Sequence, residues 1–255
     1  DFTGRIPVTG NDELSDLTER FNQMSAELDT YTKQVYLSKI KQTEAELNAL
    51  KSQIYPHFLY NTLEVIRMTA VGRNDPMVAD MIEALSDQIR YVIGTVNDLV
   101  PLGREVDILT KYIYLLNCRF SNKVTFSYDC AHLENILIPK LILQPIVENA
   151  FKHGICPKEE GGVVRIRVNP LREKGLLCIR VVDNGVGIQL DQLRQLRGAL
   201  SQPGERWEHI GIYNVAARLR LLDRNSRFVI RSHPGRGTAV VLYLPLVENE
   251  EEFEE

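Results

Sequence analysis

The sequence lacks any apolar run approaching the roughly 18 residues that a membrane-spanning helix needs, and it has no signal peptide at its start. We therefore expect that these 255 residues do not themselves enter a membrane. Positive charge is not in excess either, because 30 Lys and Arg face 34 Asp and Glu, for a formal net charge of −4. The basic residues are scattered, so nucleic acid is not expected as the main partner.

Cysteine is also scarce. Cys118, Cys130, Cys156 and Cys178 lie far apart, without the C-x-x-C spacing of a zinc site or the density of a disulfide scaffold. We expect reduced, structural thiols in a cytosolic setting. The length and the ordinary share of apolar residues predict more than one domain, and the start without methionine suggests a segment cut from a longer protein.

Helical periodicity dominates the first half. Over residues 14–35 an apolar residue recurs alternately every three and every four positions, as in a coiled coil. After residue 35 the pattern shifts by one residue and continues up to residue 54. A plain dimerisation helix and a signalling helix both fit. Either favours a parallel homodimer, because one helix cannot bury its seam alone.

A proline and a turn divide the helices that follow. Pro56 should kink the chain or restart the helix just before His57, because an interior proline costs about 3 kcal/mol. Apolar stripes at residues 59–70 and 78–96 then predict an antiparallel hairpin, and two such hairpins make a four-helix bundle. A further helix is expected at residues 106–120.

Beyond Ser121 the pattern changes to strands and helices, which predicts an α/β two-layer sandwich after a mainly α first half. The acidic residues 248–255 are expected to form a solvated tail. The expected strands are 124–128, 163–168, 176–182, 228–231 and 238–244, and the expected helices are 140–153 and 211–222.

The helix expected at residues 140–153 carries three polar side chains at a spacing that places them together. Helical periodicity places Asn149, Lys152 and His153 on one face. An amide oxygen, an ammonium and an imidazole together suit a magnesium ion and phosphates. A solvated face with a pair between Glu148 and Lys152 explains the same residues and, taken alone, explains them better.

A carboxylate and a glycine turn follow an apolar strand. Asp183 could accept a hydrogen bond from an adenine amino group, and Gly185 and Gly187 allow close backbone approach. An ordinary Asp-Asn-Gly turn is the alternative. Two later segments join them: the helix that begins near Gly211 offers N–H groups to phosphate, and the hydroxyl of Thr238 could lie beside Asp183.

In this order the segments resemble the GHKL-type ATP-binding domain shared by histidine kinases, gyrase, MutL and heat-shock chaperone ATPases. The sequence Pro-His-Phe-Leu-Tyr-Asn-Thr-Leu at residues 56–63 resembles the phosphoacceptor motif of LytS/YesM-type sensor histidine kinases. The first 30 residues resemble part of a HAMP linker, which in this family follows a transmembrane helix. The resemblance implies HAMP at 1–30, a coiled coil with dimerisation and phosphotransfer helices at 31–120, the ATP-binding catalytic domain at 121–246 and a tail at 247–255.

The resemblance also implies an activity: ATP-dependent phosphorylation of His57, oriented by Asn61, and phosphoryl transfer to an aspartate of a response regulator. It implies the cytoplasmic portion of a cell-membrane protein, joined upstream to a transmembrane sensor domain. Asn149 would coordinate Mg²⁺, with Glu148 beside it in the same catalytic motif. The implied ATP-binding residues are Asn149, Lys152, His153, Asp183, Gly185, Gly187, Gly211, Asn214 and Thr238.

Two residues depart from the family pattern. His209 stands where the second glycine box usually begins with glycine, and Phe58 follows His57 where many histidine kinases have an acid. Two alternatives therefore stay open: a conformational ATPase of the same superfamily, and a dimeric ATP-binding scaffold that no longer transfers phosphate.

Overall fold

The computed structural model describes residues 20, 23, 24, 55–93, 99–121, 123–130, 133–201 and 210–248. The chain divides into two compact units, Asp1–Leu59 and Tyr60–Glu255. The coiled coil expected at residues 14–54 lies outside the described residues, apart from residues 20, 23 and 24, which are helical. His209 and the acidic residues 249–255 also lie outside them. Within the described part, no helix combines the length and apolar character that a bilayer crossing requires.

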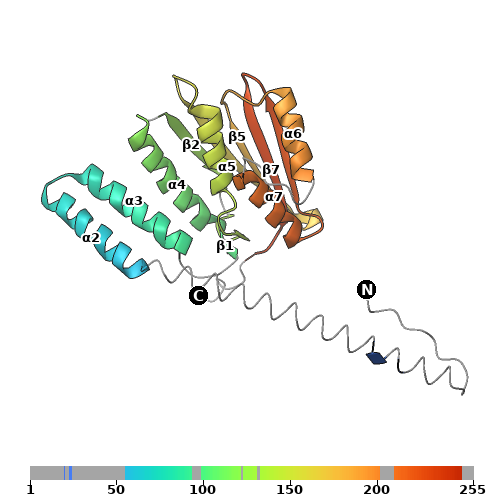
Figure 1. The fold of residues 1–255 in the computed structure, drawn as a ribbon, viewed down its shortest axis with the longest axis horizontal. Coiled ribbons are helices and arrows are strands. Elements are labelled where there is room, and N and C mark those ends of the chain that lie inside the picture. Colours follow the sequence, from blue (N-terminus) through green and yellow to red (C-terminus); the bar gives the residue numbers. More distant parts are fainter. Residues whose placement is uncertain are drawn as a thin grey trace, which may run out of the picture. The chain divides into compact units, whose positions relative to one another are not determined.

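An antiparallel helical hairpin opens the described region (Figure 1). Helix α2 (Pro56–Gly72) begins at Pro56, where the missing N–H of proline is no loss, so a helix does start just before His57. The helix expected to precede it lies outside the described residues. After a turn, helix α3 (Pro76–Ile93) returns, and Asp75 accepts a hydrogen bond from the Val78 N–H at 3.2 Å. The guanidinium carbon of Arg90 lies 5.4 Å from the Tyr60 ring centroid, which joins the two helices.

Helix α4 (Leu102–Arg119) packs against α3 and against the sheet. Its fully buried Leu102 and Leu109 belong to the main hydrophobic core. Before it, the short strand β1 (Leu99–Pro101) pairs antiparallel with β3 (Leu137–Pro139). This two-stranded sheet was not predicted, because three residues are too few to show a strand periodicity.

The five-stranded sheet has the order β2-β4-β5-β7-β6. Only β2 and β4 pair in parallel, and the other pairs are antiparallel. Along β4, Val164 and Ile166 are buried whereas Arg165 is exposed, so one face of the sheet packs on the core. The strands are β2 (Val124–Asp129), β4 (Gly162–Leu171), β5 (Leu176–Asp183), β6 (Arg227–His233) and β7 (Gly237–Pro245).

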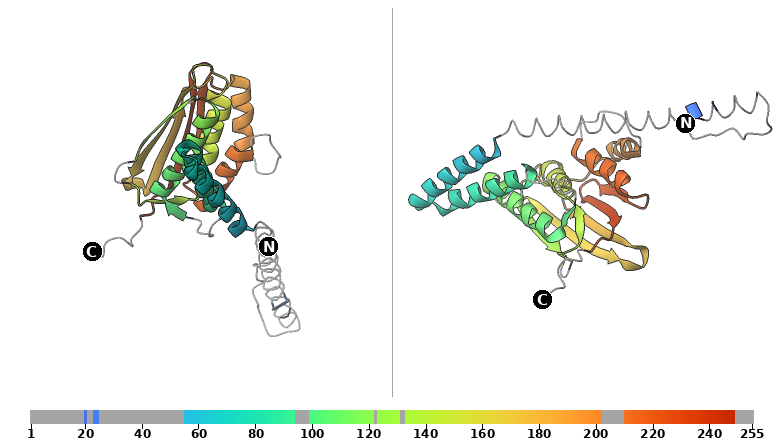
Figure 2. Two further views of the ribbon diagram at one scale, coloured as in Figure 1. Left: turned by 90° about the vertical axis from the view of Figure 1, so that its left-hand side faces the viewer. Right: turned by 90° about the horizontal axis from the view of Figure 1, so that it is seen from below.

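Helices cover that face of the sheet, and none of the helices among the described residues covers the other face (Figure 2). They include α5 (Gln144–Asn149), the π-helix η1 (Ala150–Ile155), α6 (Leu190–Ser201) and α7 (Ile210–Leu222). The arrangement is the α/β two-layer sandwich that the sequence predicted. Helix α6 was not predicted.

The helix expected at residues 140–153 is shorter and less regular than the apolar pattern predicted. It begins only at Gln144, because residues 140–143 are not helical and Leu141 has a left-handed φ of 59°. From Ala150 it continues as a π-helix, in which the Cys156 N–H donates to the Phe151 carbonyl five residues earlier, at 2.7 Å.

The segment expected to be a solvated tail starts inside the fold. The Val247 carbonyl accepts a hydrogen bond from the Leu137 N–H at 2.8 Å, and Glu248 forms a β-bridge with Ile136. Arg172 Nη2 lies 3.4 Å from a carboxylate oxygen of Glu248. The prediction of a tail is therefore wrong for these two residues, whose backbone groups pair with a neighbouring segment.

Candidate functional site

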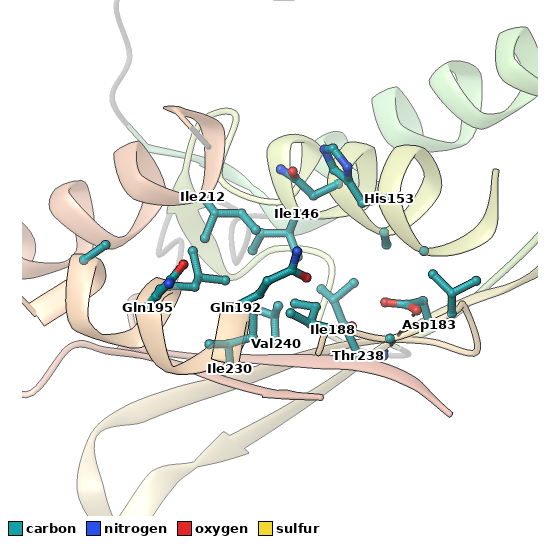
Figure 3. Close-up of a pocket in the computed structure, with 18 residues that line it drawn as sticks. Ile146, His153, Asp183, Ile188, Gln192, Gln195, Ile212, Ile230, Thr238 and Val240 are labelled. Atoms are coloured by element: carbon teal, nitrogen blue, oxygen red, sulfur yellow. Dashed lines mark hydrogen bonds between the residues drawn. The ribbon is translucent and has the colours of Figure 1, made fainter. Parts of the chain in front are cut away.

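A cavity of about 670 Å³ lies between the helical layer and the sheet (Figure 3). Among the residues that the sequence singled out, it is lined by Asn149, His153, Asp183, Gly187 and Thr238. Most other lining residues are apolar, including Ile146, Ile188, Ile212, Ile230 and Val240. An apolar cavity with a few fixed polar groups is typical of a small-molecule site.

Asp183, the last residue of β5, is the one acidic residue among the described residues that line the cavity, and it is buried, with 5% of its surface exposed. Its Oδ1 accepts hydrogen bonds from the Gly185 N–H at 2.9 Å and the Thr238 N–H at 3.2 Å. Burial raises the pKa of Asp183, and these two bonds oppose that rise. Because both bonds go to Oδ1, Oδ2 remains to accept a hydrogen bond from a ligand.

A serine that was not predicted orients Thr238. The Oγ of Ser232, on β6, donates to the Gly237 carbonyl at 2.9 Å, accepts from the Ile188 N–H at 2.9 Å and lies 2.8 Å from the Thr238 Oγ1. Since the serine proton is used by Gly237, the threonine hydroxyl donates to Ser232 and keeps its lone pairs for the cavity. Thr238 therefore bonds to Asp183 through its backbone N–H, and its hydroxyl bonds to Ser232.

Gly185 and Gly187 serve different purposes in the turn after β5. A Cβ at Gly185 would lie 2.4 Å from the Gly154 Cα, so glycine at this position allows η1 to pack directly on the turn. Gly185 itself does not line the cavity. The Val186 N–H donates to the Gly154 carbonyl at 2.9 Å across the same contact. Gly187 lines the cavity and has a left-handed φ of 70°, a conformation that favours glycine.

Asn149 has a defined orientation at the end of α5. Its Nδ2 donates to the Pro145 carbonyl at 2.6 Å, so its Oδ1 is the atom available to a cation or a donor. Gly211 lies against the same residues at the start of α7, where a Cβ would be in ordinary van der Waals contact, 3.4 Å from the Pro145 Cβ and 3.5 Å from the Asn149 Nδ2.

The remaining expected residues lie outside the cavity lining. Glu148, Lys152 and Asn214 are exposed on α5, η1 and α7. Burial and the charge of Glu148 raise the pKa of Tyr112, on α4, to about 12. His57 and Asn61 are exposed on α2, and His57 belongs to the unit Asp1–Leu59.

Helix α6 supplies two further polar groups, Gln192 and Gln195, to the cavity wall. In Figure 3, Asp183 and Thr238 lie together at one end of the cavity, away from Gln195. Sequence reasoning missed both glutamines because it missed their helix. Among the described residues, no group of three or more His, Cys, Asp or Glu is placed to hold a metal ion.

Three family models match the chain in sequence. The HAMP domain matches residues 1–30, the histidine kinase family matches residues 45–124, and the histidine kinase-, DNA gyrase B- and HSP90-like ATPase family matches residues 135–248. The last match contains the whole cavity lining. Proteins of this ATPase family bind ATP.

Curated relatives agree with these matches. Sensor histidine kinase YesM of Bacillus subtilis is 31% identical over 94% of this chain and 40% of its own length. Sensor histidine kinase YpdA of Escherichia coli is 35% identical over 79% of this chain and 34% of its own length. Sensor protein LytS of Bacillus anthracis is 32% identical over 84% of this chain and 36% of its own length.

The chain therefore spans about 40% of the length of YesM and somewhat less of the other two relatives. Among solved structures, the histidine kinase domain of the Erythrobacter litoralis EL346 blue-light activated histidine kinase aligns with 75% of this chain and 94% of that chain, with 17% identity and a TM-score of 0.44. On its three ordered family matches and these relatives, the chain belongs to the sensor histidine kinases of two-component systems and carries their catalytic portion.

Proposed function

We propose that the chain binds ATP in the cavity, transfers the γ-phosphoryl group to its own His57, and passes it on to an aspartate of a response regulator. The observation that carries the proposal is the buried carboxylate of Asp183, held through Oδ1 by two backbone donors at one end of an apolar cavity. An adenine ring matches such a cavity, since its faces are apolar and its exocyclic amino group is a donor that needs a fixed acceptor.

The size and lining of the cavity also suit a nucleotide. Its volume of about 670 Å³ falls within the range of roughly 300–1,000 Å³ found for small-molecule sites. Asp183 would accept from the adenine amino group, and Thr238, oriented by Ser232, would support the same end. Asn149 and His153 line the cavity from α5 and η1, and Lys152 and the N-terminal end of α7 would neutralise phosphate charge.

Asn149 is the residue proposed to hold magnesium. Mg²⁺ usually keeps several waters and binds through one or two protein oxygens together with substrate phosphates. The amide oxygen of Asn149, oriented by the bond from its Nδ2 to Pro145, fits that requirement. When bound, the ion would neutralise negative charge on the phosphates.

His57 is proposed as the phosphoacceptor. Its side chain is exposed near the start of α2, and a neutral imidazole offers a ring nitrogen with a lone pair. A P–N bond forms at the unprotonated ring nitrogen as the bond between the γ-phosphorus and the bridging oxygen of ADP breaks. The other ring nitrogen then loses its proton to solvent or to a base, which leaves a neutral phosphoimidazole. Asn61, one turn along α2, is proposed to orient the ring, and Glu148 to supply an exposed carboxylate beside Asn149 as a proton acceptor.

The exposed apolar surface of the α2–α3 hairpin supports a homodimer. Val65 and Met68 on α2 and Met77 and Leu85 on α3 are large apolar side chains that remain exposed in a single copy. A second hairpin would bury them in a four-helix bundle. Dimerisation and a response-regulator partner are common to the family, and the HAMP match suggests that the chain is the cytoplasmic portion of a membrane sensor.

The test is incubation of the purified chain with γ-labelled ATP and magnesium. We expect label on the protein that survives alkali and is lost in acid, as a phosphoramidate is. Free phosphate without protein label would favour the conformational ATPase. Binding of ATP without either product would favour the scaffold and refute the proposal.

A further inference from the structure

We propose that Glu105 is a positioning residue for the nucleotide site and that Tyr91 connects it to helix α3, so that the position of α3 and the occupancy of the cavity are coupled. The proposal rests on the proposed binding of ATP in the cavity. None of the residues that carry it belongs to the cavity lining, and all lie within the unit Tyr60–Glu255.

Glu105 is an acidic residue in the interior, on the first turn of α4, with 1% of its surface exposed. Its Oε2 accepts hydrogen bonds from the Leu141 N–H at 3.0 Å and from the Tyr91 hydroxyl, and its Oε1 accepts from the Leu143 N–H at 3.1 Å. Every partner is a donor, which suits an ionised carboxylate and no neutral group of the same shape. Burial raises the pKa of Glu105, and the bonds from these partners oppose the rise.

The two backbone donors belong to the loop that leads into the nucleotide site. Residues 140–143 connect β3 to α5, the helix that ends at Asn149. This loop is the irregular segment in which Leu141 has a left-handed φ. Glu105 therefore satisfies N–H groups that have no helical partner and sets where α5 begins.

A second element holds the same loop from the opposite helix. Arg218 Nη1, on α7, donates to the Lys140 carbonyl at 2.7 Å. The Lys140 ammonium in turn lies 4.9 Å from the centroid of the Tyr91 ring, within the range of a cation–π contact. The loop is thus bound by α4, by α7 and by the side chain of Tyr91 on α3.

Helix α3 is attached to α4 at two further points one turn away from Tyr91. Gln88 Nε2, which is buried, donates to the Ile108 carbonyl at 2.6 Å, and Asp87 pairs with Lys111. A purely structural contact here needs no buried charge, because apolar side chains of similar volume stabilise as well or better. The carboxylate instead joins one hydroxyl of α3 to two amides of the loop before α5.

Such a link must act in both directions. If the position of α3 changes the geometry of the cavity wall through Glu105, then ATP binding must change α3 by the same coupling free energy. Hydrogen exchange of backbone amides reports both ends, at Leu141 and Leu143 in the loop and at residues 84–93 of α3.

The first variant is Glu105→Gln, which keeps the shape but turns one oxygen into a donor that faces other donors. We expect ATP affinity to fall by about tenfold or more, as for a buried donor left without an acceptor, and the Leu141 and Leu143 amides to exchange faster. Asp107→Asn, an exposed carboxylate on the same helix, is the matched control and should change neither. An ATP affinity of Glu105→Gln equal to that of the wild type overturns the positioning role.

Tyr91→Phe tests the link to α3 and keeps the proposal falsifiable if the first variant does not fold. It removes only the hydroxyl, so the two loop bonds to Glu105 and the affinity for ATP should remain. The contact of Lys140 with the ring and the other attachments of α3 to α4 also remain. We therefore expect the ATP-dependent change in exchange at residues 84–93 to shrink severalfold, whereas Tyr128→Phe, an exposed tyrosine on β2, should keep it in full. An undiminished change in Tyr91→Phe overturns the link. Failure of the wild type to bind ATP overturns the proposed function and this inference together. Normal ATP binding by both the wild type and Glu105→Gln overturns this inference alone.

Discussion

Replacing Asp183 by asparagine changes one atom that matters to a ligand and preserves those that hold the turn. The amide oxygen can keep both bonds that Oδ1 accepts, from the Gly185 and Thr238 N–H groups. The amide nitrogen then takes the place of Oδ2 and presents N–H groups to the cavity. An adenine amino group would meet a donor in place of an acceptor.

The magnitude follows from the hydrogen bond that is lost. A bond to a charged acceptor contributes about 1.5–3 kcal/mol, and each 1.4 kcal/mol is about a factor of ten in affinity. The affinity of Asp183→Asn for ATP should therefore fall roughly 10- to 100-fold. The free energy of unfolding should change by less than about 1 kcal/mol, because both backbone bonds survive.

The assay is titration with a fluorescent ATP analogue, together with urea unfolding of the same preparation. Asp191→Asn is the matched control, since Asp191 is an exposed carboxylate at the start of α6. Unchanged affinity in Asp183→Asn, with the folded state intact, would refute the assignment of Asp183 to adenine.

The pH dependence of binding gives an independent check on the same carboxylate. Burial raises the pKa of Asp183, so protonation removes the charged acceptor at a higher pH than for an ordinary aspartate. ATP affinity of the wild type should fall as the pH is lowered through this raised pKa, and Asp183→Asn should lack that component. The free energy of unfolding should change in the opposite direction. Because the pKa of Asp183 is higher in the folded than in the unfolded state, the folded state binds the proton more tightly, and its stability rises as the pH falls from the folded-state pKa to the unfolded-state pKa. Urea unfolding of wild type and variant across acidic pH measures it.

Three further substitutions test the rest of the cavity. Ser232→Ala leaves the Ile188 N–H and the Thr238 hydroxyl without their partner, and we expect a loss of about 1–3 kcal/mol of stability, measured by urea unfolding, with weaker ATP binding. Gly185→Ala sets a Cβ 2.4 Å from the Gly154 backbone, so ATP binding should be lost and the melting temperature lowered. Asn149→Ala should abolish the increase in ATP affinity that magnesium produces but leave binding in EDTA nearly unchanged, as a titration with and without the metal would show.

The sequence predicted those helices and strands in which apolar residues recur with a regular period. The strand at Leu176–Asp183 and the helix at Ile210–Leu222 appear within a residue of their expected bounds, because one face of each is apolar. Helix α6 was missed because its exposed glutamines, arginines and Gly198 dilute the apolar stripe formed by residues such as Leu193 and Leu196. The π-helix after Asn149 has no local signature.

The candidate site was predictable only where a residue type suggests chemistry by itself. Asp183 and Asn149 stand out because polar groups follow an apolar strand or sit among apolar residues. Ser232 and Glu105 do not, because what defines them is bonds to other segments. Ser232 bonds to Gly237 and Thr238, 5 and 6 residues away, and to Ile188, 44 residues away. Glu105 bonds to Tyr91, Leu141 and Leu143, which lie 14, 36 and 38 residues away. Only the folded chain shows that Ser232 bonds to the Thr238 hydroxyl and that Glu105 bonds to the loop before α5.

The most direct measurement for the account is to locate the phosphoryl group after incubation with γ-labelled ATP and magnesium, in the wild type and in His57→Gln. We predict acid-labile label in a peptide that contains residues 56–63 of the wild type, and none in the variant although the variant still binds ATP. Label that persists in His57→Gln, or that maps to another histidine, would contradict it.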